Sequence, residues 1–393
     1  MKNFKQSGMA ATGLALVIGF AQTAIAQDAT IEVGGRLMID YDIVDIKTPD
    51  VSVNASEVRR ARLFAKGKFG DAISYKFELN HATGDDIELT DGYLQFKPEG
   101  QNLFVTVGQH RTHNSLDETT SSRFISTIER ASLTDAFELN RRLGITVGAL
   151  GDNYTLKAGL FGDSVSGAAF DKDGHAASAR FTYLPYEFED TLVHIGGSWR
   201  YRNGSDSQDD TVNDGLRYRQ RPYAHTLGSD NTDGVLSSGR IVATPRFAKS
   251  DNLFMIEGLA IHKNMWAAAE YSILNANGAA GNADGDFSGG YIEAGYIIGG
   301  KRSYKKSAGS FDRSKVDNPV GSGGMGALAL VVRYDTLDLQ DGPYLGKLDT
   351  IVLGADWLPT KQTRFRINYF NSDATNGAAK SASGIAARLG FDF

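Results

Sequence analysis

The sequence contains no cysteine, so no disulfide supports the fold and thiol chemistry is excluded. Proline is scarce, with 8 residues among 393, whereas glycine is abundant, with 45. Together with 10% aromatic residues, this composition is typical of many strands and turns and excludes collagen-like and disordered chains. The formal net charge is −6, so the chain as a whole is not basic and nucleic acid is not expected as a partner. Any surface that handles anions must therefore be local.

Beyond its first residues the chain has no apolar run long enough for a membrane helix. At the N-terminus two lysines precede an apolar stretch over residues 9–21, and an Ala-Ile-Ala cleavage site occupies residues 24–26. This organisation is typical of a secretory signal peptide, because the apolar part is too short for a final anchor. We expect residues 1–26 to be removed on export, an uncleaved helix being the alternative, and residues 27–393 to form one domain.

The clearest pattern is an alternation with a period of two between residues 58 and 69. Successive side chains of a strand point to opposite faces, so the segment beyond Arg59 has one apolar face and one cationic face. The apolar parity consists of Ala61, Leu63, Ala65, Gly67 and Phe69, and the other of Val58, Arg60, Arg62, Phe64, Lys66 and Lys68. The pattern predicts a strand that meets lipid on one face and water on the other.

The same alternation recurs along the chain, and we count sixteen strands. A soluble β-sandwich, which is the alternative, should have polar outer faces on most strands, whereas an apolar parity is present in nearly all of them. About sixteen strands close into a barrel with room for water inside. The strands near residues 253–261, 264–274 and 287–299 alternate less cleanly, so their boundaries are the least well defined.

The expected connections alternate in length. Short turns are expected at residues 70–72, 98–101, 151–153, 262–263 and 359–360. Long polar loops are expected at residues 44–56, 110–140, 163–175, 203–250, 275–286 and 372–383. Short turns at one end and long loops at the other are typical of bacterial outer-membrane barrels, and an even strand number places both termini at the periplasmic, short-turn end. We therefore predict an all-β fold, a 16-stranded antiparallel transmembrane β-barrel in the bacterial cell outer membrane.

Several segments resemble the phosphate-selective porins, the O and P porin family. They are residues 57–71 (EVRRARLFAKGKFGD), 74–79 (SYKFEL), 120–124 (TSSRF), 128–130 (IER), 141–145 (RRLGI), 217–222 (RYRQRP) and 333–339 (RYDTLDL). The resemblance implies an outer-membrane channel, usually a homotrimer, that passes phosphate-like anions, with loops folded into the lumen and arginines and lysines along the path. The chain departs from the family at residues 110–114 (HRTHN), and its long loops contain few lysines, so a lysine funnel is not implied.

Cationic side chains occupy the lumenal parity of several strands independently of this resemblance. A guanidinium stays charged at working pH and its planar fork fits phosphate oxygens, and rings of Arg and Lys are expected in an anion pore. The alternative is that these cations only pair with lumenal carboxylates and fill a wide interior. The candidate residues for binding phosphate or other small anions are Arg36, Arg60, Arg62, Lys66, Lys68, Arg123, Arg142, Arg217, Arg219 and Arg221. Further cations on the lumenal parity are Lys157, Arg180, Arg200, Arg202, Arg333, Arg364, Arg366 and Arg388.

Three connections could shape the path. The loop at residues 110–140 is the natural constriction, and its mixture of arginines and carboxylates makes a crossed field the alternative to a positive gate. Arg217, Arg219 and Arg221 alternate along the segment at residues 203–250, which predicts a guide rail if that segment folds inward and a solvated loop if it does not. The basic segment at residues 301–315 is either a periplasmic exit patch or a solvated turn.

The sequence carries no strong enzymatic or metal-binding pattern. It has no Gly-x-Ser-x-Gly elbow, and His110 and His113 share a loop without a convincing nucleophile. Asp284 and Asp286 have a spacing reminiscent of calcium loops, but Phe287 occupies the position of the required glycine. We expect neither cofactor nor metal. A general diffusion porin without phosphate specificity and, less favoured, an outer-membrane enzyme are the alternatives to the anion channel.

The C-terminal residue is the last outward-facing position of the final strand. Phe393 follows Leu389 and Phe391 on the same parity. A free terminal strand offers an edge for pairing, so we expect the barrel-insertion machinery to recognise Phe393.

Overall fold

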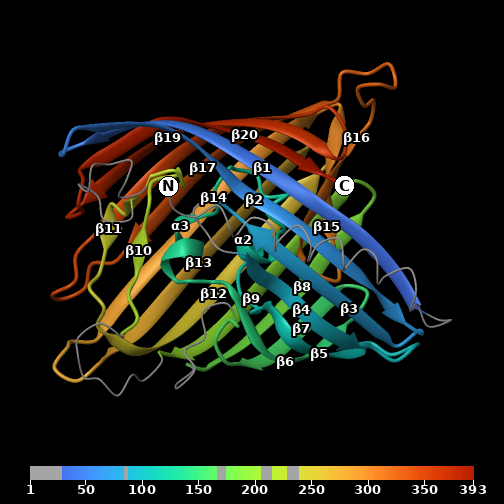
Figure 1. Cartoon of the computed structure of the whole chain (residues 1–393), viewed down its shortest axis with the longest axis horizontal. Helices are drawn as coiled ribbons and strands as arrows, with labels where there is room; N and C mark the ends of the chain where they lie inside the picture. Colours follow the sequence, from blue (N-terminus) through green and yellow to red (C-terminus); the bar gives the residue numbers. More distant parts are fainter. Residues whose placement is uncertain (1–28, 84–86, 166–173, 205–214, 228–238) are drawn as a thin grey trace, which may run out of the picture.

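The computed structural model describes residues 29–83, 87–165, 174–204, 215–227 and 239–393. The predicted signal peptide lies outside the described residues, as do parts of the predicted loops at residues 163–175 and 203–250. Within the described residues sixteen antiparallel strands form one closed barrel in chain order, and β20 pairs with β1 (Figure 1). The predicted strand number and fold class are confirmed. No helix in the described part of the chain is long and apolar enough to cross a membrane.

The barrel strands range from 8 to 19 residues in length. They are β1 (Ala29–Lys47), β2 (Val51–Phe69), β3 (Ile73–His81), β4 (Glu88–Phe96), β5 (Leu103–Arg111), β6 (Arg141–Leu150), β7 (Tyr154–Phe161), β8 (Ala176–Phe188), β9 (Thr191–Asn203), β12 (Ala248–His262), β13 (Met265–Gly278), β14 (Gly285–Ile298), β17 (Ala327–Asp338), β18 (Lys347–Leu358), β19 (Thr363–Thr375) and β20 (Ser381–Asp392). Two short helices, α2 (Leu116–Thr119) and α3 (Ser132–Ala136), and two small sheets lie outside this order. The small sheets pair β10 (Arg219–Gln220) with β11 (Val242–Ala243) and β15 (Gly300–Lys305) with β16 (Ser310–Val316).

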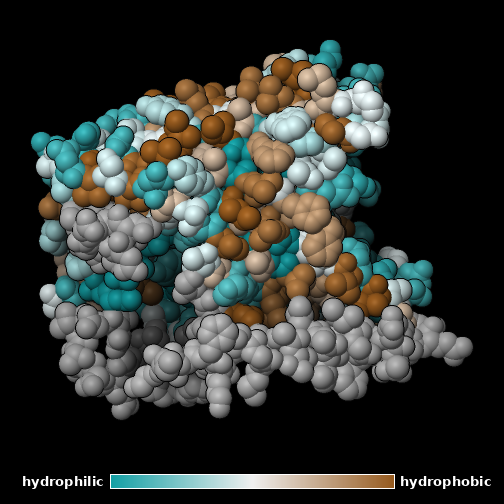
Figure 2. Space-filling model, turned by 45° about the horizontal axis from the view of Figure 1, so that its top comes forward, coloured by the Kyte–Doolittle hydropathy of each residue, from teal (hydrophilic) through white to brown (hydrophobic). Residues whose placement is uncertain are grey.

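The outer face of the barrel is apolar, as the alternation predicts. On β1, Val33, Ile39 and Ile43 are 59%, 38% and 46% exposed, whereas Asp40 and Asp42 between them are buried on the inside. Hydrophobic side chains gather over the outer surface of the strands (Figure 2). A protein in water does not present so much apolar surface, so this face meets the hydrocarbon of a bilayer.

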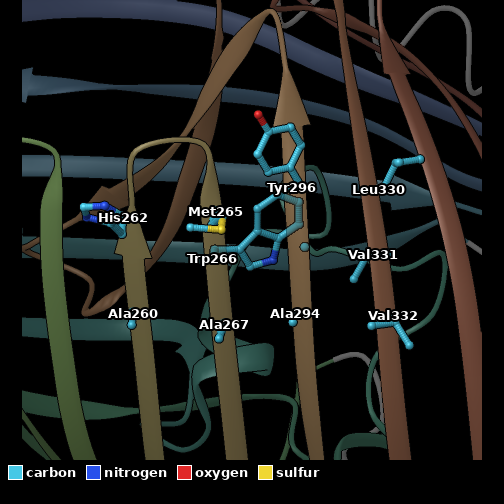
Figure 3. A pocket seen from close by; sticks show the side chains of 11 residues that line it. Ala260, His262, Met265, Trp266, Ala267, Ala294, Tyr296, Leu330, Val331 and Val332 are labelled. Atoms are coloured by element: carbon cyan, nitrogen blue, oxygen red, sulfur yellow. The ribbon is translucent and has the colours of Figure 1, made fainter.

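A shallow hollow of about 630 Å³ interrupts the outer face on β12, β13, β14 and β17. Three small side chains, Ala260, Ala267 and Ala294, lie side by side there, with the larger Met265 and Tyr296 above them (Figure 3). Its lining is almost entirely apolar, which suits the lipid-facing side of a barrel.

A β-bulge corrects the prediction for β2. Met38 pairs with Arg60, but the next residue of β1, Ile39, pairs with Val58, so Arg59 is the extra residue. Directly opposed residues of an antiparallel pair share a face, and therefore Val58 lies outside with Ile39 rather than on the lumenal side. The bulge allows Arg59 and Arg60 to point into the lumen together. The parity of Arg62, Lys66 and Lys68 is as predicted.

The predicted short turns are confirmed, but several predicted long loops are wrong. The strands β1 and β2 extend to Lys47 and Val51, so the expected loop at residues 44–56 is a turn at residues 48–50. Alternate side chains in this stretch, such as Val44 and Val53, pack in the core, which favours continued strand over loop. The loops after β13 and β19 are shorter for the same reason.

The interior is not uniformly polar, which corrects the expectation of a wet lumen. The inner faces of β12, β13, β14, β17 and β18, here named the packed sector, are mostly apolar and pack against segments folded into the barrel. The ring centroids of Phe287 and Tyr218 lie 5.2 Å apart, and the ring centroids of Phe247 and Tyr344 lie 3.9 Å apart. Both faces of these strands are therefore largely apolar, which explains why residues 253–299 alternate poorly. The inner faces of β2–β8, here named the polar sector, carry mostly polar and charged side chains.

Candidate functional site

The third long connection, residues 112–140 and here named L3, lies inside the barrel with α2 and α3 (Figure 1). Leu116, Leu133 and Phe137 of L3 are fully buried in the core of the packed sector. Burial of these side chains holds one side of L3 against β14 and β17. Of the charged side chains of L3, Glu129 pairs with Arg59 of β2 and Arg123 pairs with Asp392 of β20.

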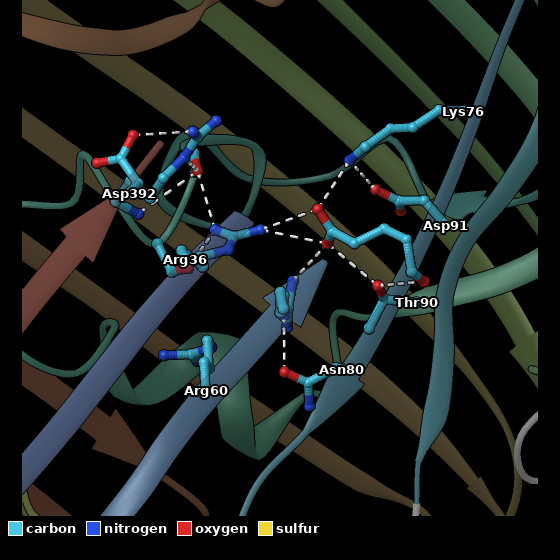
Figure 4. Close-up of polar contacts among 12 residues, drawn as sticks. Arg36, Arg60, Lys76, Asn80, Thr90, Asp91 and Asp392 are labelled. Atoms are coloured by element: carbon cyan, nitrogen blue, oxygen red, sulfur yellow. Dashed lines mark hydrogen bonds and ion pairs between the residues drawn. The ribbon is translucent and has the colours of Figure 1, made fainter. Parts of the chain in front are cut away.

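Two of the predicted anion-binding arginines meet at one carboxylate. Arg36 on β1 and Arg62 on β2 bind Glu78 of β3 at 3.2 and 3.0 Å, and Lys76 binds the same carboxylate at 3.1 Å (Figure 4). Arg62 also donates to Asn80 at 2.9 Å. Arg36 and Arg62 therefore pair with a lumenal carboxylate, as in the alternative to anion binding.

The arginines of L3 are paired as well. Arg130 shares Glu118 with Arg111 of β5 at 3.0 and 3.4 Å, and Arg123 pairs with Asp392 near the C-terminus at 3.2 Å. Charges of both signs thus border the path, as in the predicted crossed field.

A polar cavity of about 420 Å³ lies between L3, β2 and the described part of the connection after β9 (residues 215–227 and 239–247, here named L5). Five guanidinium groups and one imidazole face four carboxylates in it. The cations belong to Arg59, Arg60, Arg130, Arg221, Arg240 and His225, and the carboxylates to Glu118, Glu129, Asp135 and Glu138. L5 therefore folds inward, and its Arg221 reaches the same cavity as Arg60.

Ion pairs neutralise part of this charge. Arg59 binds Glu129 with two hydrogen bonds of 3.0 Å, and Arg240 lies 3.4 Å from Asp135. Burial by itself raises the pKa of Glu129, but the facing guanidinium groups, Arg59 first, hold that pKa well below its usual range. Glu129 therefore remains an anion at any working pH.

Arg60 differs from its neighbours. Among the residues that the structure describes, no carboxylate lies within ion-pair distance of its guanidinium, whose contact is with the sulfur of Met38 at 4.0 Å. No dashed contact joins Arg60 to the paired groups around it in Figure 4. Its half-buried positive charge is thus presented to the cavity.

The remaining predicted residues do not converge on this cavity. Lys66 pairs with Glu32 at 2.9 Å, and Arg142 pairs with Asp163. Lys68 is exposed next to the short turn at residues 70–72. Arg219 lies on β10. Arg217 is half-buried, and burial together with Arg219 and Arg246 lowers its pKa.

Sequence reasoning missed Arg59, Arg141, Arg240 and His225. Arg141 binds Asp91 at 2.6 Å, and His225 lies 3.0 Å from Glu57. The available signal was the pair of consecutive arginines at residues 59 and 60, since two like charges in a strand fit one face only at a bulge. Arg141 stands in the resembling segment at residues 141–145, but nothing in the sequence marks Arg240 and His225, because they come from a loop far from β2 in the chain.

The basic hairpin β15–β16 has both exposed and inward-facing cations. Lys301 and Lys306 pair with Asp190 and Glu187 at the short-turn end, whereas Arg302 points inward and stacks on Phe311 at 4.2 Å. The aspartates of residues 284 and 286 accept hydrogen bonds within their own hairpin. Over the described ranges the structure contains no group of three metal-ligating side chains.

Comparisons with known proteins agree with this architecture. The family described as phosphate-selective porin O and P matches residues 31–393. A protein of Caulobacter vibrioides described only as uncharacterized is 32% identical over 356 residues, covering 87% of this chain and 68% of that protein.

Solved structures with the same fold are distant in sequence. The anion-selective porin from Comamonas acidovorans is 11% identical, covering 93% of this chain and 100% of that chain with a TM-score of 0.57. The outer membrane channel DcaP of Acinetobacter baumannii is 12% identical, covering 94% and 99% with a TM-score of 0.58. These likenesses show the fold alone. Because the family match spans nearly the whole of a closed sixteen-stranded barrel, the chain is a bacterial outer-membrane porin that belongs to the phosphate-selective porin O and P family.

Proposed function

We propose that this porin prefers anions and takes up phosphate or phosphate-like anions past the cavity that contains Arg60. The observation that carries the proposal is the guanidinium of Arg60, half-buried and without a carboxylate partner among the described residues. A guanidinium cannot lose its proton at working pH, so its charge acts on every ion that enters the cavity. In a confined space with low-dielectric walls such a charge favours anions over cations.

The composition of the cavity supports phosphate-like cargo. Guanidinium forks offer paired N–H donors that match the oxygens of phosphate, and five of them face the cavity. The carboxylates beside them, such as Glu118 and Glu129, oppose a bare anion but can accept a hydrogen bond from a protonated oxygen. The family resemblance points to the same class of cargo.

A general diffusion porin without phosphate specificity is the second candidate. It is favoured by the pairing of Arg36, Arg62 and Arg123 with carboxylates, which leaves a smaller excess of positive charge than the sequence implies.

Export and assembly complete the proposal. We propose removal of residues 1–26, recognition of Phe393 by the insertion machinery, and a homotrimer embedded in outer-membrane lipid. The main chain of Phe393 exchanges hydrogen bonds of 3.1 and 3.2 Å with Gly35, so the last residue also completes the closure of the barrel.

Reversal potentials in planar bilayers test the function. We expect the wild-type channel to prefer chloride over potassium and phosphate to block the chloride current. Arg60→Met keeps the side-chain volume roughly constant and removes the charge, and a lost charged contact of about 1.5–3 kcal/mol lowers the anion-to-cation permeability ratio about tenfold or more.

The matched control is Lys97→Met. It removes one positive charge from an exposed lysine at a short turn, so it should leave the permeability ratio near the wild-type value. Heat-modifiable migration in gels checks that both variants fold. An unchanged ratio and unchanged phosphate block in Arg60→Met would contradict the proposed role of Arg60 and favour the general porin.

A further inference from the structure

Five buried arginines of the barrel wall share one geometry, and we name them the arginine collar. Each comes from a strand of the wall, each binds a wall carboxylate, and each turns its Nη1 nitrogen toward L3. They are Arg36 on β1, Arg200 on β9, Arg333 on β17, Arg366 on β19 and Arg388 on β20.

One edge of each guanidinium faces the wall. Arg388 binds both carboxylate oxygens of Asp40 at 2.6 Å through Nε and Nη2. Arg366 binds Asp356 at 2.6 Å through Nη2. The other collar arginines follow the same plan with carboxylates on other strands, namely Arg36 with Glu78, Arg200 with Asp251 and Arg333 with Glu293.

The other edge faces L3. The Nη1 groups of Arg388, Arg366 and Arg200 donate to the carbonyl oxygens of Ile128, Thr127 and Phe137 at 2.6, 2.5 and 2.7 Å. The remaining two use side chains: Arg36 donates to Ser122 at 2.9 Å and Arg333 to Asp117 at 3.5 Å. The collar thus holds L3 from several directions around the barrel.

Only arginine can make this double contact. Its guanidinium is planar and carries five N–H donors in a fixed fork, so one edge can pair with a carboxylate while the opposite nitrogen reaches a carbonyl. A lysine has a single ammonium group on a flexible stem and cannot present two separated edges. All five side chains are at most 7% exposed, so the collar arginines are poorly accessible to passing ions.

We propose that the arginine collar positions L3 and thereby sets the width of the channel, and that its members do not bind the permeating anion. This inference rests on the proposed anion channel, because the cavity that L3 borders is the one that contains Arg60. Arg388 also binds Glu129 at 2.9 Å, so a shift of L3 would move a charged wall of that cavity.

Backbone amides of L3 make a second, independent set of hydrogen bonds to the barrel wall. The amide of Ile128 donates to Asn368 at 2.6 Å, and the amide of Ser132 donates to Asp335 at 2.9 Å. Glu270 accepts from the amides of Leu116 and Asp117 at 2.9 and 2.7 Å. Carbonyl oxygens of L3 therefore accept hydrogen bonds from wall arginines, and its amides donate hydrogen bonds to wall side chains. This is the arrangement of a fixed element rather than a mobile lid.

The test separates position from charge with two variants of one residue. Arg388→Lys keeps the positive charge but loses the fork, whereas Arg388→Gln loses the charge but keeps a donor for Ile128. A nitroxide attached at Ser121→Cys reports the mobility of L3, and the natural chain has no cysteine to compete for the label. Single-channel conductance and reversal potential are measured on the same labelled proteins.

If the collar positions L3, Arg388→Lys releases it despite the retained charge. We expect the population with a mobile label to rise about tenfold, as for the loss of one charged hydrogen bond, and the conductance to increase. Lys97→Met in the same labelled background should leave both readouts at the wild-type level. Arg366→Lys provides an independent variant if Arg388→Lys inserts poorly.

The opposite pattern overturns the inference. If Arg388→Lys keeps the wild-type label mobility and conductance while Arg388→Gln loses anion preference, the charge of Arg388 acts on the ions directly. A wild-type channel without anion preference whose L3 is nevertheless released by Arg388→Lys would refute the proposed function and leave the collar standing.

Discussion

The packed sector and the polar sector belong to the same barrel and have the same apolar outer face, yet their interiors differ. Leu253, Leu274 and Phe287 line the packed sector and are at most 2% exposed, because L3 and L5 cover them. Thr106, Thr146 and Lys157 line the polar sector, where the folded-in segments present polar groups, such as the imidazole of His113 to Thr146 and the carbonyl oxygen of Ser307 to Lys157. The inner face of a membrane barrel is therefore apolar wherever a loop excludes water from it, as in a soluble core.

The two sectors also contact different side chains of L3. Its apolar side chains are buried in the packed sector, which provides most of the favourable burial, whereas Glu118 and Glu129 border the cavity beside β2. The arginine collar fixes the boundary between the two. We expect the packed sector to supply stability and the polar sector to supply selectivity.

The largest effect on stability is expected in the packed sector. Phe287→Ala removes a buried ring that contacts Tyr218, Phe247 and Tyr344. Truncation of a buried phenylalanine destabilises by about 3–5 kcal/mol, because the lost burial and the remaining cavity both cost free energy. Denaturant unfolding of the refolded barrel, followed by tryptophan fluorescence, measures the difference.

The matched substitution in the polar sector is Gln95→Ala. Gln95 is half-buried and donates one hydrogen bond to Thr106 at 3.0 Å. Loss of such a bond changes stability by about 0.5–1.5 kcal/mol. Equal destabilisation by the two substitutions would show that the sectors do not differ in the way proposed.

The sequence predicted the outer face and the strand number well, because lipid imposes the same requirement on every strand. Ile31, Leu143 and Ile385 alternate with inward residues wherever the rule is applied, and all are exposed. The interior obeys no single rule. Residues 253–299 do not alternate between apolar and polar side chains where a loop covers their inner face. The weak alternation of this segment therefore indicated the packed sector.

The lumenal parity of the arginines was also predictable, but their partners were not. Arg36 and Arg62 lie inside as expected, yet both bind Glu78, which is 42 and 16 residues away in the chain. Among the described residues Arg60 has no such partner, because the bulge at Arg59 adds a second arginine that pairs with Glu129. Pairing depends on register and on loop position, and neither is encoded by local alternation.

A smaller effect is expected at the border of the two sectors, where residues 223–227 of L5 are attached to both. Tyr223 donates to Asp335 at 2.6 Å on the packed side, and His225 lies 3.0 Å from Glu57 on the polar side. Burial, together with the charge of Arg59, lowers the pKa of His225, whose other charged neighbours are Glu129 and Arg221. The folded protein therefore holds this imidazole neutral more firmly than the unfolded chain does.

The sign of the pH dependence follows from that lowered pKa. The stability contributed by neutral His225 is complete above the ordinary histidine pKa of about 6.5 and is lost as the pH falls below it toward the folded-state pKa. We expect L5 to loosen on acidification and current fluctuations to increase between about pH 7 and pH 5. His225→Gln cannot titrate, so its fluctuations should not change over this range. An identical pH response in wild type and variant would assign it to another group.

The smallest effect is expected at the short-turn end of the polar sector, where the charge is exposed. Lys66 is about half exposed and pairs with Glu32 at 2.9 Å, and Glu32 is itself 65% exposed. Exposed pairs of this kind contribute about 0–1 kcal/mol, so Lys66→Met should leave the free energy of unfolding nearly unchanged. It should lower anion preference slightly at low salt, and the difference should vanish near 1 M salt, where the screening length is about 3 Å. If Lys66→Met reduced selectivity at high salt as strongly as Arg60→Met, selectivity would depend on the number of lumenal cations and not on the half-buried Arg60 in the cavity beside L3.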